Sequence, residues 1–150
     1  MKNIRSGFTL VEVIIVCALI ALLAALTIPN LLRSKVTAND TASLSFIKGL
    51  STALETYAAA NLSRYPVAVS LDDLASSDFA TTNPPYMQGL SLKTPQFGHN
   101  VIFASSVAGY QIAANTITVN TSGSKNYRMS TGSVLESQEA SDGDYSVTAP

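Results

Sequence analysis

The sequence predicts an α+β fold in which one long N-terminal helix packs on a small antiparallel β-sheet. Two observations lead to this prediction. A long apolar stretch near the N-terminus continues into a segment whose apolar residues recur every three or four positions, the spacing of one helix face. The last third of the chain instead holds short strand-like runs separated by turns that contain Gly and Ser. The helix is therefore expected to have a membrane-spanning half and an amphipathic half.

The apolar half extends from Phe8 to Leu32 and contains a single charged residue, Glu12. At about 1.5 Å per residue it forms a helix of roughly 37 Å, enough to cross a hydrocarbon core of about 30 Å. The run is longer than the apolar core of a cleaved secretory signal. Lys2 and Arg5 precede it and favour a cytoplasmic start. We therefore predict a membrane segment.

A simple anchor does not explain Glu12. A carboxylate near the start of a membrane helix costs on the order of 2–3 kcal/mol, so such a group normally has a partner. The sequence offers no Lys or Arg between Arg5 and Arg33. Glu12 is therefore a candidate functional residue.

An amphipathic helix is expected to continue to about Asn61. Pro29 removes one backbone hydrogen bond and should kink or locally open this helix. Gly49 weakens it by roughly 1 kcal/mol. The apolar residues of its predicted face are Val36, Leu44, Ile47, Leu50, Leu54 and Tyr57.

The remainder is expected to form a small domain. Tyr65-Pro66 ends the helix, Ser70 is a candidate N-cap with Asp73 three residues later, and prolines punctuate a loop that runs to about Gly98. A three- or four-stranded antiparallel sheet should then pack on the amphipathic helix. Its expected strands are 100–105, 110–114, 116–120, 126–130 and 133–136.

Composition excludes several classes of function. Nine Lys and Arg against ten Asp and Glu give a net charge of −1, which does not suit a basic nucleic-acid binder. The single Cys17 permits no internal disulfide. Glycine-rich phosphate loops, dinucleotide fingerprints and zinc spacings are missing from the sequence. His99, the one histidine, follows a glycine and is interpreted as a surface residue. We expect no enzyme, no cofactor and no small-molecule substrate.

One weak metal candidate lies near the C-terminus. Asp142-Gly143-Asp144 supplies carboxylate oxygens, which calcium prefers. The surrounding residues do not complete an EF-hand pattern. A solvated tail is the favoured interpretation, so we expect no metal, with Asp142 and Asp144 as the candidates should one bind.

The start of the chain resembles a known family. Gly7-Phe8-Thr9-Leu10-Val11-Glu12, behind a short basic leader and ahead of an apolar helix, is similar to the prepilin-peptidase signature of type IV pilins and type II secretion pseudopilins. The similarity continues through 24–33 and weakens over 38–40 and 52–57. It covers about the first third of the chain closely and implies the pilin fold.

The resemblance implies a role for four residues. Gly7 corresponds to the last leader residue, after which a membrane aspartyl peptidase cuts. Phe8 becomes the new N-terminus, whose amine is methylated. Glu12 corresponds to the glutamate that neutralises this amine on a neighbouring subunit during assembly. Pro29 marks the segment where the helix of relatives melts in the filament.

These correspondences divide the chain into five expected parts. The parts are a leader (1–7), a transmembrane and assembly helix (8–32), an amphipathic helix half (33–62), an αβ-loop region (63–98), and the sheet with a C-terminal tail (99–150).

Two functions remain open. The first is a structural subunit of a type IV pilus-like surface filament for adhesion, twitching motility or DNA uptake. The second is a major pseudopilin of a type II secretion system. Residues 30–33 and 39–40 favour the pilin, although a C-terminal pair of cysteines typical of many pilins is missing from the sequence. Implied partners are identical subunits, prepilin peptidase and an inner-membrane assembly platform. The chain would reside in the inner membrane and then in a surface filament, or in the periplasm for a pseudopilin.

Overall fold

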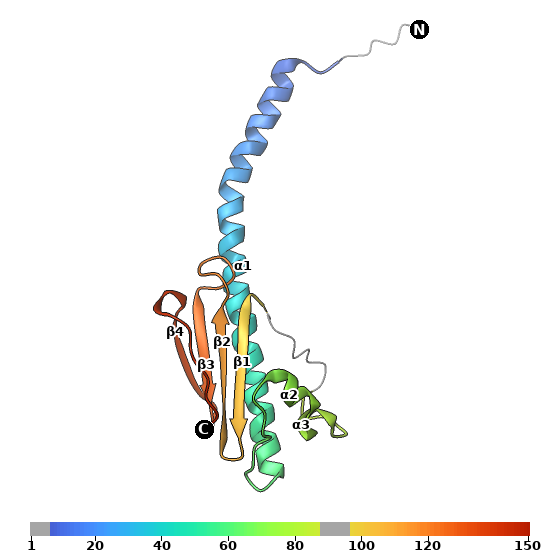
Figure 1. The fold of residues 1–150 in the computed structure, drawn as a ribbon. Helices are drawn as coiled ribbons and strands as arrows, with labels where there is room; N and C mark the ends of the chain where they lie inside the picture. Colours follow the sequence, from blue (N-terminus) through green and yellow to red (C-terminus); the bar gives the residue numbers. More distant parts are fainter. Residues whose placement is uncertain (1–6, 88–96) are drawn as a thin grey trace, which may run out of the picture. The chain divides into compact units, whose positions relative to one another are not determined.

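A computed structural model describes residues 7–87 and 97–150 of the chain (Figure 1). The chain forms two compact units, one up to Ser34 and one from Lys35 to Pro150. Helix α1 (Leu10–Ala60) contributes its first half to the first unit and its second half to the second. The predicted α+β class is confirmed.

In the first unit, α1 continues through Pro29 as an uninterrupted helix. The expected local opening of the helix is therefore not observed. The proline nitrogen still cannot donate to the carbonyl of Ala25, four residues earlier. Thr27 Oγ1 donates to the Leu23 carbonyl at 2.8 Å, and Ser34 Oγ to the Asn30 carbonyl at 3.0 Å. These hydroxyl groups are satisfied within the helix itself, so the segment needs no polar partner at these positions.

The second unit contains a four-stranded antiparallel sheet in the order β1-β2-β3-β4 (Figure 1). Each strand is joined to the next in sequence, so the sheet is a simple meander. The strands are β1 (His99–Ser106), β2 (Gly109–Thr116), β3 (Lys125–Ser130) and β4 (Val134–Glu139), followed by a short 3₁₀ helix, η1 (Ala140–Asp142).

The strand predicted over 116–120 is wrong. Thr116 is the last residue of β2, and residues 117–124 form a loop that bonds to itself. The N–H groups of Thr121 and Ser122 both donate to the Thr118 carbonyl, at 3.1 and 2.9 Å. Residues 117–124 are rich in β-branched side chains, which are typical of strands. The segment nevertheless turns back on itself, and an isolated bridge joins Val119 to Gly123.

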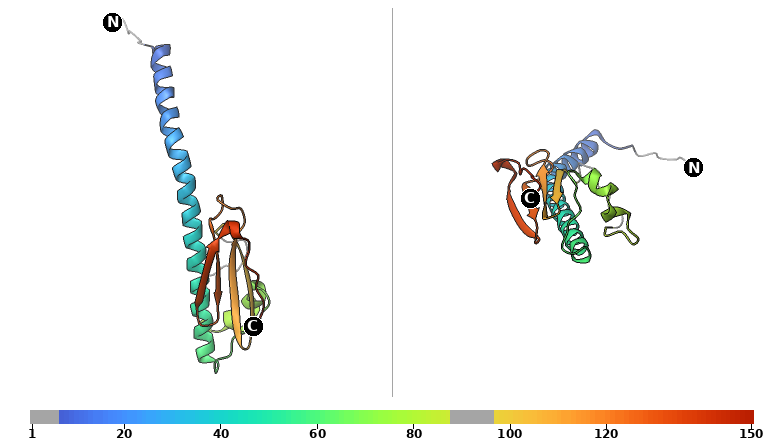
Figure 2. Two further views of the ribbon diagram at one scale, coloured as in Figure 1. Left: turned by 90° about the vertical axis from the view of Figure 1, so that its left-hand side faces the viewer. Right: turned by 60° about the horizontal axis from the view of Figure 1, so that its bottom comes forward.

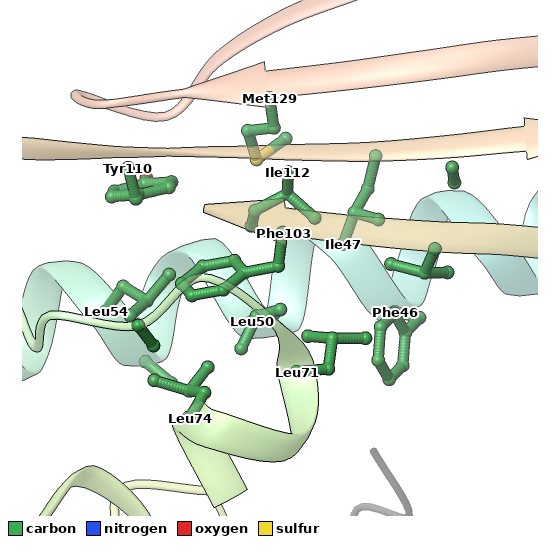
Figure 3. Packing of buried hydrophobic residues seen from close by; sticks show 14 of the residues in the cluster. Phe46, Ile47, Leu50, Leu54, Leu71, Leu74, Phe103, Tyr110, Ile112 and Met129 are labelled. Atoms are coloured by element: carbon green, nitrogen blue, oxygen red, sulfur yellow. The ribbon is translucent and has the colours of Figure 1, made fainter. Parts of the chain in front are cut away.

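The core lies between the sheet and the part of α1 that follows Lys35 (Figures 2 and 3). Ile47, Leu50 and Leu54 are fully buried at the spacing expected for one helix face. The predicted amphipathic face is thus confirmed, with Val36, Leu44 and Tyr57 partly buried. The sheet contributes Val101, Phe103, Tyr110, Ile112, Ala114, Tyr127 and Met129.

Helices α2 (Leu71–Ser76) and α3 (Asp78–Thr81) close one side of this core. Ser70 caps α2 as predicted, because its hydroxyl accepts the N–H of Asp73 at 3.1 Å. The sequence did not predict α3, which buries Phe79 against Tyr57 and Tyr86. The predicted loop up to Gly98 falls partly on residues 88–96, outside the described residues.

The C-terminal tail, expected to be solvated, is instead bonded to the sheet. Strand alternation places Gln111, Ala113 and Asn115 of β2 on the face opposite the core. Asn115 donates to the Tyr145 carbonyl at 2.8 Å and accepts the N–H of Tyr145 at 3.0 Å. Gln111 accepts the N–H of Thr148 at 3.2 Å. Ala113 between them is fully buried, so the tail covers this part of the sheet.

Candidate assembly segment and buried polar sites

Gly7, Phe8 and Thr9, directly ahead of α1, are exposed to solvent. Gly7 and Phe8 are not helical, and the Phe8 ring is 82% exposed. Among the described residues other than its chain neighbours, no atom comes within 4 Å of the position where Gly7 would carry a Cβ atom. The described part of the chain therefore leaves space around the Gly7–Phe8 bond.

Thr9 determines where α1 begins. Its hydroxyl oxygen accepts the N–H of Glu12 at 3.2 Å, and its carbonyl accepts the N–H of Val13 at 3.3 Å. Thr9 is therefore the N-cap, and Glu12 occupies the third helical position, as in a capping box. The Thr-x-x-Glu spacing could have revealed this in the sequence.

Glu12 points to solvent in the first turn of α1. An acidic side chain is favoured there because the helix N-terminus carries a partial positive charge. The structure of a single chain shows no ion pair for Glu12 among the described residues. Its carboxylate is thus available to a group from outside the chain.

The large apolar side chains in the first half of α1 are exposed in the described chain. Leu10, Leu23 and Leu26 are 64–74% exposed, and the large apolar residues from Phe8 to Leu32 all resemble them in being exposed. By length and composition, α1 contains a segment capable of crossing a membrane. Exposed apolar surface on this scale requires lipid or other chains to cover it. Pro29 lies in this same exposed segment.

The two metal candidates do not come together with a third ligand. Asp142 lies in η1, and its carboxylate accepts the Ser141 hydroxyl at 3.5 Å. Asp144 accepts the amide of Asn126 at 3.3 Å. No group of three or more His, Cys, Asp or Glu side chains suited to a metal occurs among the described residues.

His99 is buried, which corrects its interpretation as a surface residue. It is fully inaccessible at the start of β1, against Ser43 of α1. Its Nδ1 atom lies 2.8 Å from Ser43 Oγ and its Nε2 atom 3.4 Å from Asp40 Oδ1. The carboxylate of Asp40 also accepts the N–H and hydroxyl of Ser124. The site formed by Asp40, Ser43, His99 and Ser124 was not predictable from the sequence, because its residues are separated by up to 84 positions.

Glu55 is a second polar centre of the folded unit. Its carboxylate accepts the hydroxyls of Tyr65 and Tyr110, at 2.9 and 3.0 Å, and the N–H of Gly132 at 2.8 Å. It therefore links α1 to the segment after the helix, to β2 and to the β3–β4 turn. Burial, followed by the hydrogen bond to Glu55 and its negative charge, raises the pKa of Tyr65 to about 12. Burial also raises the pKa of Tyr110.

Comparison with known proteins agrees with the N-terminal features. Residues 2–28 match the family described as the prokaryotic N-terminal methylation motif. The type II secretion system core protein G of Aeromonas hydrophila is 38% identical over 84 residues, which cover 55% of this chain and 58% of that protein. The core protein G of Dickeya chrysanthemi is 38% identical over 66 residues, covering 44% and 42% of the two chains.

A pilus protein is also similar. The type IV wide pilus major component PilA4 of Thermus thermophilus is 51% identical over 47 residues, which cover 31% of this chain and 35% of that protein. The chain thus spans less than two thirds of each of these relatives. No solved structure matches it significantly. In its methylation motif, its relatives and its α+β fold, the chain is similar to type IV pilins and type II secretion pseudopilins.

Proposed function

We propose that the chain is a structural subunit of a type IV pilus-like surface filament. In this proposal a prepilin peptidase cuts after Gly7, the amine of Phe8 is methylated, and subunits polymerise through the first half of α1. The observation that carries the proposal is the exposed apolar helix with one carboxylate, Glu12, in its first turn. A homopolymer would cover that surface with copies of itself.

Glu12 would pair with the Phe8 ammonium of a neighbouring subunit. In the membrane, an unpaired carboxylate can take up a proton or reach the headgroups, which limits its cost. Neither route is open inside a filament, where an unpaired buried charge costs several kcal/mol. Pairing between subunits would therefore set their register. Pro29 would lower the cost of opening the helix during assembly, because one hydrogen bond is already missing there.

A second candidate is a major pseudopilin, whose filament is short and periplasmic. The observation that favours it is the similarity to core protein G, which extends over 84 residues and thus well beyond the 27 residues of the methylation motif. Both candidates require the same cleavage and the same helix packing. They differ in where the filament is found.

Electron microscopy of material sheared from cells, with an antibody against this chain, separates the two. Abundant labelled filaments that disappear when the gene is deleted support the pilus. Unlabelled or missing filaments, together with a loss of protein secretion in the deletion strain, support the pseudopilin. Normal secretion and unchanged surface filaments in the deletion strain would contradict both candidates.

A further inference from the structure

The carboxylate of Asp40 is buried where α1, β1 and the loop of residues 117–124 meet. Asp40 is 7% exposed, and both of its oxygens accept hydrogen bonds from Ser124. Among the described residues, His99 is its one ion-pair partner, at 3.4 Å. A buried carboxylate is costly unless a cation or several donors compensate it. His99 is therefore the available counter-charge.

The Nε2 atom of His99 is surrounded by acceptors. The carbonyl of Lys125 lies at 3.0 Å, and Asp40 Oδ1 lies beyond it at 3.4 Å. The hydroxyl of Thr116 is 3.2 Å from Nε2 and can donate to the Lys125 carbonyl at 3.0 Å. In that arrangement Thr116 accepts from the ring. Nε2 must carry a hydrogen.

The Nδ1 atom also faces an acceptor, the carbonyl of Phe97 at 3.1 Å. A neutral imidazole has one N–H, and Nε2 already uses it. In that form Ser43 donates to Nδ1, and the Phe97 carbonyl faces a nitrogen lone pair. An imidazolium donates from both nitrogens and satisfies both carbonyls. The hydrogen-bond geometry thus fits the charged ring better than the neutral one.

We propose that His99 is a proton-operated latch, which in its imidazolium form ties Asp40 of α1 to Lys125 of β3 and to Phe97 ahead of β1. Loss of the proton on Nδ1 of His99 removes the counter-charge of Asp40 and the hydrogen bond to the Phe97 carbonyl. The 117–124 loop then loosens, because Asp40 holds Ser124 and the neighbouring Asn39 donates to the Ser122 carbonyl at 2.7 Å. The subunit is consequently tighter in mild acid than in mild alkali.

The other titratable or charged groups on the elements packed against His99 are few. On β3, the Tyr127 ring lies 6.3 Å from the imidazole, and Lys125 contributes its carbonyl while its side chain is exposed. Glu139 of β4 acts on Tyr127 but is not an ion-pair partner of His99. The described residues of the 117–124 loop, β1 and β2 that face the ring carry no charge. Of these side-chain types, only histidine ordinarily titrates between about pH 5 and 8.

The chain contains a single histidine, which makes the latch directly measurable. Nitrogen-15 histidine can be incorporated into the full chain in detergent micelles and observed by NMR. At about pH 5, we expect both ring nitrogens to be protonated and both N–H protons to exchange slowly with water. A neutral ring at that pH, or rapidly exchanging N–H protons, would overturn the proposal.

Thermal melting of the same full-length samples gives an independent measurement. The Tm of the wild type should fall from about pH 5 to about pH 8. His99→Gln should show a flat profile because the titrating group is lost, and Asp40→Asn should show a shallower fall than the wild type because only the counter-charge is lost. Ser43→Ala removes the hydroxyl that donates to Nδ1 of the neutral ring but leaves the Phe97 carbonyl for the imidazolium, so this variant should keep the fall in Tm or make it steeper. A flat wild-type profile, or an equal slope in Asp40→Asn, would contradict the latch.

Discussion

At the scale of single residues, buried polar groups join distant parts of the chain. Glu55 binds two tyrosine hydroxyls and one backbone N–H, and Asp40 binds Ser124 and His99. These contacts were not predictable, because the partners of a polar residue depend on which segments the fold brings together. The apolar residues of the same helix face were predictable, because helical periodicity alone determines their side.

The Glu55 site predicts a loss of stability in alkali. The pKa of a tyrosine in the unfolded chain is about 10, whereas the pKa of Tyr65 in the folded chain is raised to about 12. Between these values the unfolded chain loses the proton first, so stability is complete below the lower value and falls as pH rises through the higher one. Chemical denaturation as a function of pH measures this loss.

Tyr65→Phe should reduce the alkaline loss without abolishing it, because burial also raises the pKa of Tyr110 and Tyr127. An alkaline profile identical to the wild type would show that Tyr65 is not coupled to folding.

Gly123 is closely packed against Asp40 and His99. A Cβ atom on Gly123 would lie 2.7 Å from Asp40 Oδ1 and 2.7 Å from His99 Cε1. Gly123→Ala should therefore lower the Tm by separating the loop from the buried site. Gly49→Ala is the matched control: its Cβ would meet only the tip of Met87, at 3.8 Å, and helix propensity should stabilise the chain by about 0.8–1 kcal/mol. Equal effects of the two substitutions would refute this account.

At the scale of elements, the sequence predicted the helices and strands unevenly. The long helix, the Ser70 cap and four strands followed from periodicity and turn residues. The strand expected over 116–120 failed because β-branched residues also suit a short loop whose ends are fixed by tertiary contacts. Helix α3 was missed because four residues carry too little periodic signal.

The C-terminal tail is held against β2 by hydrogen bonds. Side-chain amides of Gln111 and Asn115 hold its backbone, and Arg128 lies 4.9 Å from the centre of the Tyr145 ring. Deleting residues 143–150 should lower the Tm and speed amide hydrogen exchange in β2, where Ala113 would become exposed. Asn115→Ala should give part of both effects. Unchanged exchange in β2 after the deletion would mean that the tail does not protect the sheet.

The two candidate calcium ligands, Asp142 and Asp144, do not share a hydrogen-bond partner. Asp142 and Asp144 lie in one short stretch but bond to different partners, Ser141 and Asn126. We therefore expect the melting curve of the full chain in micelles to be the same with calcium and with a chelator. A chelator-induced fall in Tm that Asp142→Asn removes would instead establish a cation site.

At the scale of the whole molecule, the two units differ in how their apolar surface is covered. The unit from Lys35 onward buries its apolar face internally, whereas the large apolar residues from Phe8 to Leu32 stay exposed. Such surface fits a chain that passes from a membrane into a polymer. The sequence allowed this to be predicted because an apolar run needs no tertiary context, and the N-terminal motif added the proposed cleavage site.

The two-unit organisation predicts that Glu12 acts in assembly and not in folding. Glu12→Ala should leave cleavage, membrane insertion and the near-ultraviolet circular dichroism of the second unit unchanged, because Glu12 belongs to the first unit and its side chain is exposed. The yield of sheared filaments should fall sharply. Ser45→Ala, on the exposed surface of α1, serves as a neutral control. Normal filament yield from Glu12→Ala would remove the pairing role.

In the proposed function, Gly7 and Phe8 mark the boundary between a leader and an assembling subunit. Mass spectrometry of the N-terminal peptide from purified filaments measures this boundary. We expect a peptide that begins at Phe8 with a methylated amine. Filaments built from chains that still begin at Met1 would contradict it.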